Sequence, residues 1–413
     1  MLIIYRVLIN TIFILSPIII LYRLLRNKED LRRVKEKFCL FSKKKTKGKL
    51  LWFHGASVGE LQSIIPLLEK LEKDREIKQI LITSNTLSSS KIIEKYKFKK
   101  IVHQFFPIDT NALSKKFLNY WSPSSAFFID SEIWPNMLNN LNKKGIKISL
   151  INGRITKKSF NRWMRFKNFS KNIFFKFDLC LASSFESKNY LKKLGAKSPK
   201  FLGNLKFSQS EKSVINIDKN LEKLIKLRKT WCASSTHKTE EMFCGTVHKI
   251  LKKKYKNLLT IIIPRHVNRA PSIINELSNL DLKVHTDEPR KKIDKDTDIY
   301  VVNSYGKTKS FYKNCKNIFL GGSLINHGGQ NPLEATRFGC NILHGPNVDN
   351  FKEIFKFLKK RKISFKVKTK IKMIKTLDRL LSKKTNSKDI KKRLNFIGQK
   401  ILNSTYKEIK TII

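Results

Sequence analysis

Short apolar runs, each followed by a polar turn and an amphipathic stretch, recur along most of the chain. The run 50–53 is the first; it ends in the turn 54–60 and leads into a helical periodicity through Leu71. Strands of a parallel sheet that is covered on both faces have this pattern, because both sides of each strand are buried. The pattern therefore predicts an α/β protein. We expect strands at 50–53, 80–83, 126–129, 146–151, 179–182, 230–233, 258–263, 299–302, 318–320 and 341–343.

A polar stretch from 208 to 220 divides these strands into two sets. Two sets of alternating strands and helices predict two Rossmann-like, doubly wound domains that face a cleft. We expect the first domain at 48–215 and the second at 216–413, with a Lys-rich helical end from Phe351. Residues 1–47 are expected to form a separate segment, a membrane anchor followed by a basic linker.

The anchor is predicted from the apolar run Leu2–Tyr22, which would form a helix of about 31 Å, long enough to cross a bilayer. Arg6 interrupts the run, so a helix lying in the membrane interface remains an alternative to a spanning one. The following segment 23–47 carries 11 basic and 3 acidic residues, and such flanks stay cytoplasmic. The run is too long for a cleaved signal peptide, and no small-residue cleavage site follows it.

The chain is strongly basic, with 86 Lys and Arg against 32 Asp and Glu, a formal net charge of +54. Its 41% hydrophobic residues are enough for sizeable cores, which excludes a disordered polycation. The charge is compatible with nucleic acid, with an anionic membrane or acidic substrate, or with a composition merely rich in Lys, Asn and Ile. No recognised nucleic-acid motif is present. The six cysteines form no C-x-x-C pair, which argues against a disulfide framework or a zinc site.

Candidate chemistry lies where the predicted strands end, which is where ligands bind in open α/β sheets. In the first domain, Glu60 lies at a strand-to-helix turn and suits a general base, or is an ordinary acid at a helix start. Glu132 follows another strand as a second candidate acid. In the second domain, Arg265 and His266 follow a strand and could pair with phosphate or carboxylate.

Six of the 16 glycines fall between Gly321 and Gly345. Gly-rich turns that open a helix present backbone N–H groups to an anion. Here the turn 328–331 precedes Pro332, and Glu334 in the first helical turn could accept hydrogen bonds from ribose or simply favour the helix dipole. The stretch matches neither the dinucleotide fingerprint nor the P-loop.

Asp294, Asp296 and Asp298 imitate the D-x-D metal motif of some glycosyltransferases, but they lie in a Lys-rich loop. We expect all three carboxylates to face solvent. Since no strong metal-ligand spacing is present either, no metal is predicted.

Ten blocks of the sequence occur together and in order. They are WFHGASVGE, DSEIWPNML, INGRITKKSF, LASSFESKNYLKKLGA, GNLKF, ASSTHKTEE, IIIPRHVNR, NSYGKTKSFY, GGSLINHGGQNPLEATRFG and GPNVDNF, within residues 2–351. In these blocks the sequence resembles the 3-deoxy-D-manno-octulosonic acid (Kdo) transferases of lipopolysaccharide assembly. The resemblance implies a GT-B fold with an acceptor-binding domain followed by a CMP-Kdo-binding domain. It also implies inverting, metal-independent transfer of Kdo from CMP-Kdo to a lipid A precursor, with no cofactor.

The resemblance also assigns residues. Glu60 would be the general base that deprotonates the attacking sugar hydroxyl, and the acceptor side would include Ser57, Gly59, Glu132 and Lys206. Arg265 and His266 would hold the donor's phosphate or carboxylate. The remaining donor-side residues would be a nucleotide cradle of Gly322, Ser323, Gly329, Asn331 and Glu334, and a second loop of Ser234, Ser235 and Thr236.

Several positions depart from the family pattern, which has His, Pro, Asp and Glu where this chain has Gln330, Ala335, Asn303 and Lys307, and a Thr-rich turn where this chain has Ser84, Asn85 and Thr86. None of these departures removes Glu60 or Arg265. The implied partners are CMP-Kdo, a lipid A precursor and anionic inner-membrane lipid, with no specific nucleic acid. The implied location is the inner membrane, with the catalytic domains on its cytoplasmic side. The alternatives are another GT-B transferase that uses a UDP-sugar, and a non-enzymatic basic protein that binds nucleic acid or anionic lipid.

Overall fold

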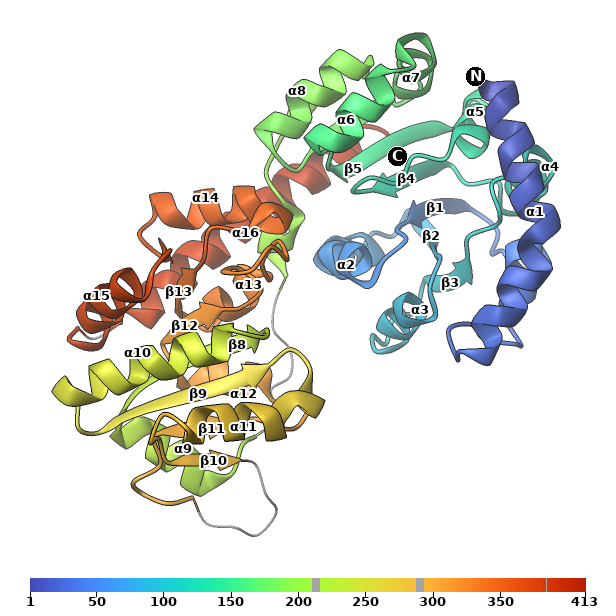
Figure 1. The fold of residues 1–413 in the computed structure, drawn as a ribbon. Helices are drawn as coiled ribbons and strands as arrows, with labels where there is room; N and C mark the ends of the chain where they lie inside the picture. The colour runs from blue at the N-terminus through green and yellow to red at the C-terminus, as the bar shows by residue number, and fades with distance from the viewer. Residues whose placement is uncertain (210–215, 287–292, 384) are drawn as a thin grey trace. The chain divides into compact units, whose positions relative to one another are not determined.

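The computed structural model describes residues 1–209, 216–286, 293–383 and 385–413. The chain divides into two compact units, one of Met1–Gln209 with Ile397–Ile413 and one of Ser210–Phe396 (Figure 1). Both units are parallel α/β sheets with helices on their faces, as the spacing of apolar runs predicts.

The sheet of the first unit has the strand order β3-β2-β1-β4-β5-β6-β7. Its strands are β1 Lys49–His54, β2 Ile77–Ser84, β3 Ile101–Phe105, β4 Ser125–Ile129, β5 Lys147–Gly153, β6 Leu179–Ala182 and β7 Lys200–Phe201. Its helices are α1 Leu2–Leu25, α2 Val58–Glu72, α3 Leu87–Glu94, α4 Asn111–Trp121, α5 Pro135–Lys143, α6 Lys157–Met164, α7 Lys167–Phe174 and α8 Phe185–Leu194, with the short 3₁₀ turns η1 Val34–Phe38 and η2 Leu205–Ser208.

The sheet of the second unit has the order β10-β11-β9-β8-β12-β13-β14. Its strands are β8 Lys229–Thr236, β9 Leu258–Pro264, β10 Val284–Thr286, β11 Ile299–Val301, β12 Asn317–Leu320, β13 Asn341–His344 and β14 Ser364–Lys366. Its helices are α9 Lys219–Leu227, α10 Glu240–Lys254, α11 Ala270–Ser278, α12 Thr308–Asn314, α13 Pro332–Arg337, α14 Lys352–Lys360, α15 Lys370–Leu381 and the first part of α16 Ser387–Lys410, with the 3₁₀ turns η3 Val267–Arg269 and η4 Asp349–Phe351.

In each sheet the order of the strands switches sides at the first strand, so later strands are added on its other edge. In the first unit β1 pairs with both β2 and β4, and in the second β8 pairs with both β9 and β12. The loops that follow the central strands diverge at such a switch point and leave a crevice for a ligand. The fold therefore directs attention to the loops after β1 and β4, and to those after β8 and β12.

The ten predicted strands are confirmed, with small shifts at their ends, but the structure adds β3, β7, β10 and β14. β3 has the sequence IVHQF, in which His103 and Gln104 break the apolar run although both are buried. The expectation of an entirely helical end from Phe351 is wrong, because β14 pairs with β13 within it.

The end of the chain also differs from the expected boundary at 413, because Ile397–Ile413 belongs to the first unit. Its contacts there are specific. Lys410 Nζ lies 2.8 Å from Asp74 Oδ2, Lys200 Nζ lies 2.6 Å from Glu408 Oε2, and Ser125 Oγ donates to the Ile412 carbonyl at 3.0 Å.

Residues 26–47 are not the separate linker that the charge pattern suggested, because they pack along the β3 edge of the first sheet. The buried Glu36 carboxylate accepts the Phe105 N–H at 2.8 Å, and the Ile108 N–H donates to the Lys37 carbonyl at 3.1 Å. Gln79 Nε2 donates to the Lys44 carbonyl at 3.0 Å. The bond from Phe105 pairs a backbone N–H of the edge strand β3 that would otherwise be open.

Candidate functional site

The first-unit site begins at the turn between β1 and α2. Ser57 is the N-cap of α2, and its hydroxyl accepts the Glu60 N–H at 3.4 Å. Glu60 Oε2 in turn accepts the Ala56 N–H at 2.7 Å and the Ser57 N–H at 3.4 Å, which completes a capping box. A Cβ placed on Gly59 would meet nothing within 4 Å, so this turn borders open space that a ligand could enter.

The Glu60 carboxyl has an altered acidity. Burial, and then the nearby charges of Glu132 and Asp130, raise its pKa to about 7, against the lowering effect of the bonds from Ser57 and Ala56. A carboxyl group that titrates near neutrality is half deprotonated at physiological pH and can accept a proton. Glu60 is therefore a helix-capping residue whose raised pKa is compatible with the predicted general base, and the catalytic role stays a prediction.

The loop after β4 brings further charged groups to this turn. Glu132 Oε2 accepts Trp134 Nε1 at 2.9 Å and lies 3.2 Å from Nε2 of the buried His54. Asp130 is buried with a positive φ of 59°, and burial raises the pKa of its carboxyl while Lys206 opposes the rise. Lys206 Nζ lies 3.9 Å from Asp130 Oδ2.

The structure thus gathers Ser57, Glu60, Glu132 and Lys206 around one carboxylate cluster, and their role on the acceptor side stays a prediction. Asp130 belongs to this cluster and was not singled out from the sequence. The signal was available, because Asp130 directly follows a predicted strand in the same block as Glu132.

In the second unit, the Gly-rich loop after β12 is organised by a carboxylate that the sequence did not reveal. Glu240, at the start of α10, is buried and accepts the backbone N–H groups of Gly322 at 2.7 Å, Ser323 at 3.2 Å and Leu324 at 3.0 Å. It also accepts the His237 N–H at 3.0 Å. Since Gly322 and Ser323 already donate to Glu240, their N–H groups are not open to a phosphate, and their place in a nucleotide cradle stays a prediction.

Imidazoles and guanidinium groups surround this loop instead. The ring centroid of His237 lies 4.5 Å from that of His327 and 6.3 Å from that of His266. Burial, and then the charges of His327, His266 and Arg265, lower the pKa of His237. The Arg265 guanidinium and the ring N–H groups gathered in this way suit an anion. His237 and His327 were not singled out from the sequence, although both lie within the quoted blocks.

Two polar atoms near these rings, Thr236 Oγ1 and His237 Nε2, are buried without a hydrogen-bond partner in the described part of the chain. Buried polar atoms are nearly always paired, so such atoms mark a place where a ligand can complete the hydrogen bonding. The backbone also fits close here: Gly322 has a φ of 64°, and a Cβ on it would lie 3.2 Å from His237 Nε2 and His327 Cδ2.

The other expected donor residues lie at the same end of the sheet. The Arg265 N–H donates to the Thr236 carbonyl at 2.9 Å, so the exposed Arg265 lies beside the β8 turn, where Ser235 has a φ of 55°. Ser234 differs, because it is buried and its hydroxyl pairs with the Tyr312 hydroxyl at 2.7 Å.

The loop after β12 continues into α13. The Gly329 N–H donates to the Gly322 carbonyl at 2.9 Å, which folds the loop back on itself. Asn331 caps α13 by accepting the Leu333 N–H at 3.1 Å, and Glu334 lies in the first turn. Burial, and then the charge of Glu334, raise the pKa of Tyr312.

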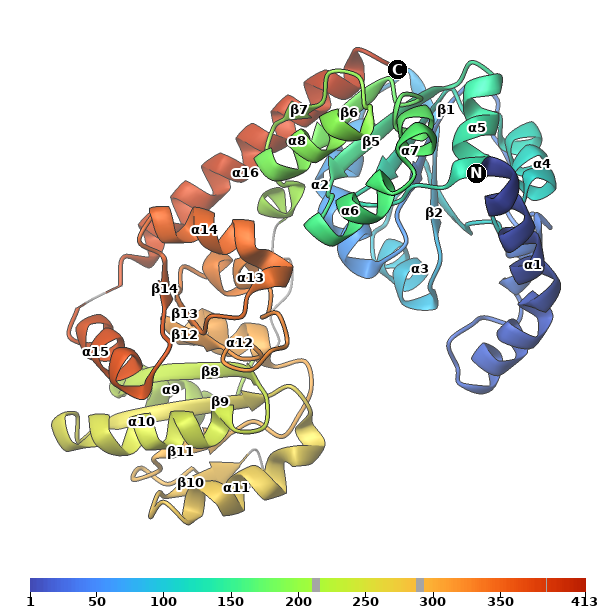
Figure 2. The same ribbon diagram turned by 45° about the horizontal axis from the view of Figure 1, so that its top comes forward.

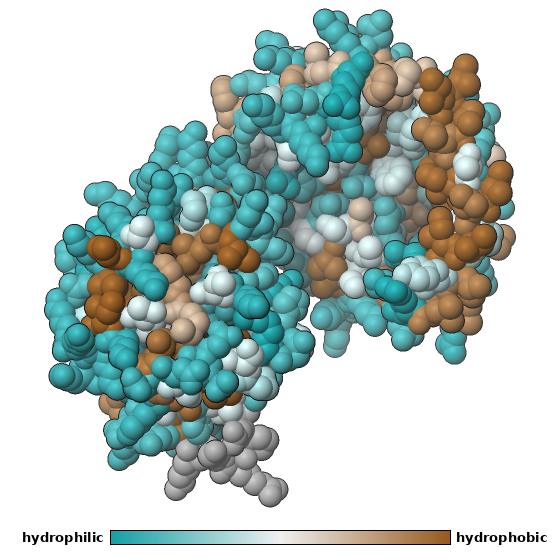
Figure 3. Space-filling view, in the orientation of Figure 1, coloured by the Kyte–Doolittle hydropathy of each residue, from teal (hydrophilic) through white to brown (hydrophobic). Residues whose placement is uncertain are grey.

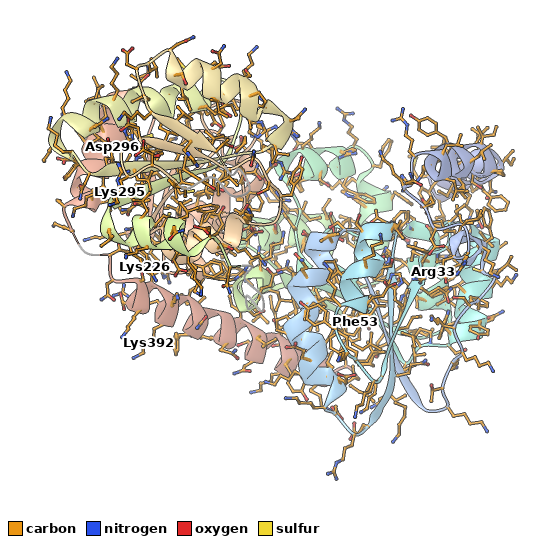
Figure 4. All side chains as sticks on the ribbon, turned by 90° about the horizontal axis from the view of Figure 1, so that it is seen from below. Arg33, Phe53, Lys226, Lys295, Asp296 and Lys392 are labelled. Carbon is orange, nitrogen blue, oxygen red and sulfur yellow. The ribbon has the colours of Figure 1, made fainter. Side chains whose placement is uncertain are left out.

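The three aspartates of the D-x-D pattern lie in the loop before β11, in different surroundings. Asp294 and Asp296 are exposed, with Asp296 Oδ2 3.2 Å from Lys283 Nζ; Figure 4 shows Asp296 beside Lys295 on this loop. The expectation that Asp298 faces solvent is wrong, because its buried carboxylate lies 2.6 Å from Lys252 Nζ and accepts the Lys283 N–H at 3.0 Å. Within residues 1–209, 216–286, 293–383 and 385–413, no group of three His, Cys, Asp or Glu is placed to hold a metal.

Comparison with solved structures places the architecture in the GT-B class of two Rossmann-like units. A crystal structure of UDP-N-acetylglucosamine 2-epimerase matches with a TM-score of 0.60 at 13% identity, over 89% of this chain and 96% of that one. That likeness shows the fold alone.

The sequence comparisons identify the family. A family model described as 3-deoxy-D-manno-octulosonic-acid transferase matches residues 32–209. The 3-deoxy-D-manno-octulosonic acid transferase of Rickettsia bellii is 33% identical over 406 residues, covering 95% of each chain. That of Haemophilus influenzae is 28% identical over 357 residues, covering 85% of this chain and 83% of the other. The chain belongs to the 3-deoxy-D-manno-octulosonic acid transferase family and is a glycosyltransferase.

Proposed function

We propose that the protein transfers Kdo from CMP-Kdo to the sugar hydroxyl of a lipid A precursor with inversion, and that Glu60 is the general base. The observation that carries the assignment of the base is the Glu60 carboxyl, at the carboxyl end of β1, with a pKa raised to about 7. An unperturbed glutamate is too weak a base to remove a hydroxyl proton efficiently, whereas a base with a pKa near the working pH is well matched to the task.

The first unit is proposed to bind the acceptor. Ionised Glu60 would take the proton as the acceptor oxygen attacks the anomeric carbon, and the bond to the CMP phosphate breaks. Glu132 keeps the Glu60 pKa high and, with its bonds to Trp134 and His54, holds a fixed position. Lys206, beside Asp130, would place a positive charge near an anionic group of the acceptor.

The second unit is proposed to bind the donor through side chains rather than through the loop N–H groups. Arg265 would neutralise the phosphate of the CMP leaving group, and His266, His237 and His327 would offer ring N–H groups to it, which stabilises the charge that develops as the bond to Kdo breaks. Glu240 would hold the Gly322–Leu324 loop in the shape that leaves room for the nucleotide. Asn331, Gly329 and Glu334 would lie at the ribose end of the same loop.

Membrane attachment through α1 is part of the proposal, with both units on the cytoplasmic side. α1 is long and apolar enough to cross a bilayer by length and composition alone, with a mean hydropathy of 2.1 over its best window. Neither a cofactor nor a metal is required by the proposed chemistry, so transfer is expected to persist in the presence of EDTA.

Incubation of the detergent-solubilised protein with CMP-Kdo and a tetraacylated lipid A precursor tests the proposal, with mass spectrometry of the lipid product. We expect a mass increase of one or more Kdo residues, its loss in Glu60→Gln, and its retention in the control Glu186→Gln, which removes an exposed carboxylate of α8. Transfer from a UDP-sugar instead of CMP-Kdo would overturn the donor assignment. No transfer with any donor, together with tight salt-dependent RNA binding, would overturn the proposed enzyme function.

A further inference from the structure

The outward face of α1 is an apolar surface that runs from one end of the helix to the other. Its most exposed side chains include Ile3, Ile14, Ile18 and Leu25, which are 75%, 74%, 69% and 77% exposed. Figure 3 shows this face as a continuous hydrophobic band along the edge of the first unit. An apolar surface of this length on a folded protein is a site for a partner or a membrane rather than for water.

The opposite face of α1 is fixed to the first unit near its N-terminal end. The Tyr5 hydroxyl donates to Asp109 Oδ2 at 2.8 Å, and Arg6 donates to Asn136 Oδ1 at 3.0 Å and to Asn111 Oδ1 at 3.3 Å. Asp109 is buried and also accepts the N–H groups at the start of α5. The charge of Arg6, which interrupts the apolar run in the sequence, is therefore used to hold the helix to the protein.

The other end of α1 is held as well. Arg23 Nε lies 2.6 Å from the buried Glu29 carboxylate, which also accepts Lys37 at 2.6 Å. Between the two ends, the rings of Phe13 and Phe38 are 6.0 Å apart. Figure 2 shows α1 running along the flank of the first unit with its first turns beside α5.

These contacts conflict with a helix that crosses the bilayer. The 24 residues of α1 span about 36 Å, more than the roughly 30 Å of the hydrocarbon layer. If α1 crossed the membrane, the polar groups that hold its two ends would be separated by the whole layer. The folded chain between them, including charged loops, would then be placed in hydrocarbon, where unpaired polar groups are costly.

From this geometry we propose that α1 lies in the plane of one leaflet, with its apolar face in the lipid and its polar face latched to the first unit by Tyr5 and Arg6. The inference rests on the proposed membrane attachment and adds its orientation. A lipid surface is the favoured partner because the apolar face is continuous, and because Arg26, Lys28 and Arg32 are exposed where the helix ends, at the level of anionic head groups.

Depth measurements along the helix test this orientation. Positions 3, 14 and 25 are similarly exposed, and their spacing of eleven residues offsets each from the next by only about 20°, so they share one face. Each is replaced by cysteine in turn, as in Ile14→Cys, and labelled with a bimane fluorophore. The six native cysteines are all buried, which confines labelling to the new site.

The labelled proteins are bound to phosphatidylethanolamine and phosphatidylglycerol vesicles whose acyl chains carry bromine at known depths. An in-plane helix is quenched at about the same depth at all three positions. A spanning helix would place position 14 deepest and positions 3 and 25 near opposite head groups, which overturns the proposal. Absence of quenching at every position also overturns the proposal. This result is expected if α1 pairs with a second copy of the chain instead of entering the lipid.

The latch is tested by the double variant Tyr5→Phe with Arg6→Leu, which removes the polar contacts and keeps the helix apolar. We expect the depth at position 3 to separate from the depths at 14 and 25. The control Arg26→Leu removes a charge from the end of α1 without touching the latch, and its depths stay equal; equal depths in the double variant contradict the role of the latch. Kdo transfer by the same variants in detergent is measured in parallel, so failure of the orientation is distinguishable from failure of the proposed enzyme activity.

Discussion

Replacement of Glu60 by Gln is expected to abolish transfer and, at the same time, to stabilise the protein above neutral pH. The pKa of the carboxyl rises from 4.5 in its ordinary state to about 7 in the folded protein, a difference of about 2.5. At about 1.36 kcal/mol per unit, this corresponds to at most about 3.4 kcal/mol of destabilisation when Glu60 is ionised. Since Glu60 is only half-buried, we expect about 2 kcal/mol.

The sign of the effect follows from proton binding. Between pH 4.5 and about 7 the folded carboxyl keeps its proton while the unfolded one has lost it, so wild-type stability falls as the pH rises. Gln does not titrate, and it can replace Glu in a capping box. The variant should therefore equal the wild type near pH 4.5 and exceed it by about 4–8 °C in thermal midpoint at pH 8.

Circular dichroism melts of both proteins in detergent, at intervals from pH 4.5 to 8.5, measure this difference, and the lipid mass shift measures transfer. A constant offset between the two proteins at every pH would refute the altered pKa. Wild-type turnover by Glu60→Gln would refute the general base. The two outcomes are independent, so each part of the reasoning can fail alone.

Three further changes test other parts of the structure. Glu240→Gln sets an amide against the loop N–H groups, and a rise of about tenfold in KM for CMP-Kdo with unchanged KM for the acceptor is expected; equal changes in both would contradict a role confined to the donor loop. Arg265→Lys keeps the charge but loses bidentate geometry, so a donor KM raised by about tenfold is expected, against no change if Arg265 points away from the donor. Burial tends to raise the pKa of Asp298, but hydrogen bonding from His248, Lys252 and the Lys283 N–H holds it below its ordinary value. Asp298→Asn should therefore lower the thermal midpoint at pH 7, and this deficit should shrink below about pH 4. A deficit that persists in acid would contradict the ion pair.

The sequence predicts the sheets well because strands buried on both faces carry continuous apolar runs. It misses β3 because His103 and Gln104 are polar, although His103 Nε2 pairs with the Ser84 hydroxyl at 2.9 Å inside the fold. Local patterns contain no sign of such a partner. The same limit applies to α1. In the sequence Arg6 only interrupts an apolar run, and its partners Asn111 and Asn136 become evident only in the folded structure.

The residues of the candidate site also differ in whether the sequence reveals them. Glu60 and Arg265 are recognisable because they directly follow predicted strands. Glu240 is not, because the N–H groups it accepts at Gly322 and Leu324 lie 82 and 84 residues further along the chain. Its carboxylate occupies the N–H groups of Gly322, Ser323 and Leu324, so the proposed donor site relies on imidazole and guanidinium side chains instead.

The return of Ile397–Ile413 to the first unit has a consequence for the order in which the protein is made. Synthesis runs from the N-terminus, so the first unit emerges from the ribosome early, yet its bonds at Ser125 and Asp74 need the last residues of the chain. The unit translated first is therefore completed last. A nascent chain interrupted anywhere in the second unit would leave both units incomplete. Proteases and chaperones would then encounter two incompletely folded units rather than one folded unit and one fragment.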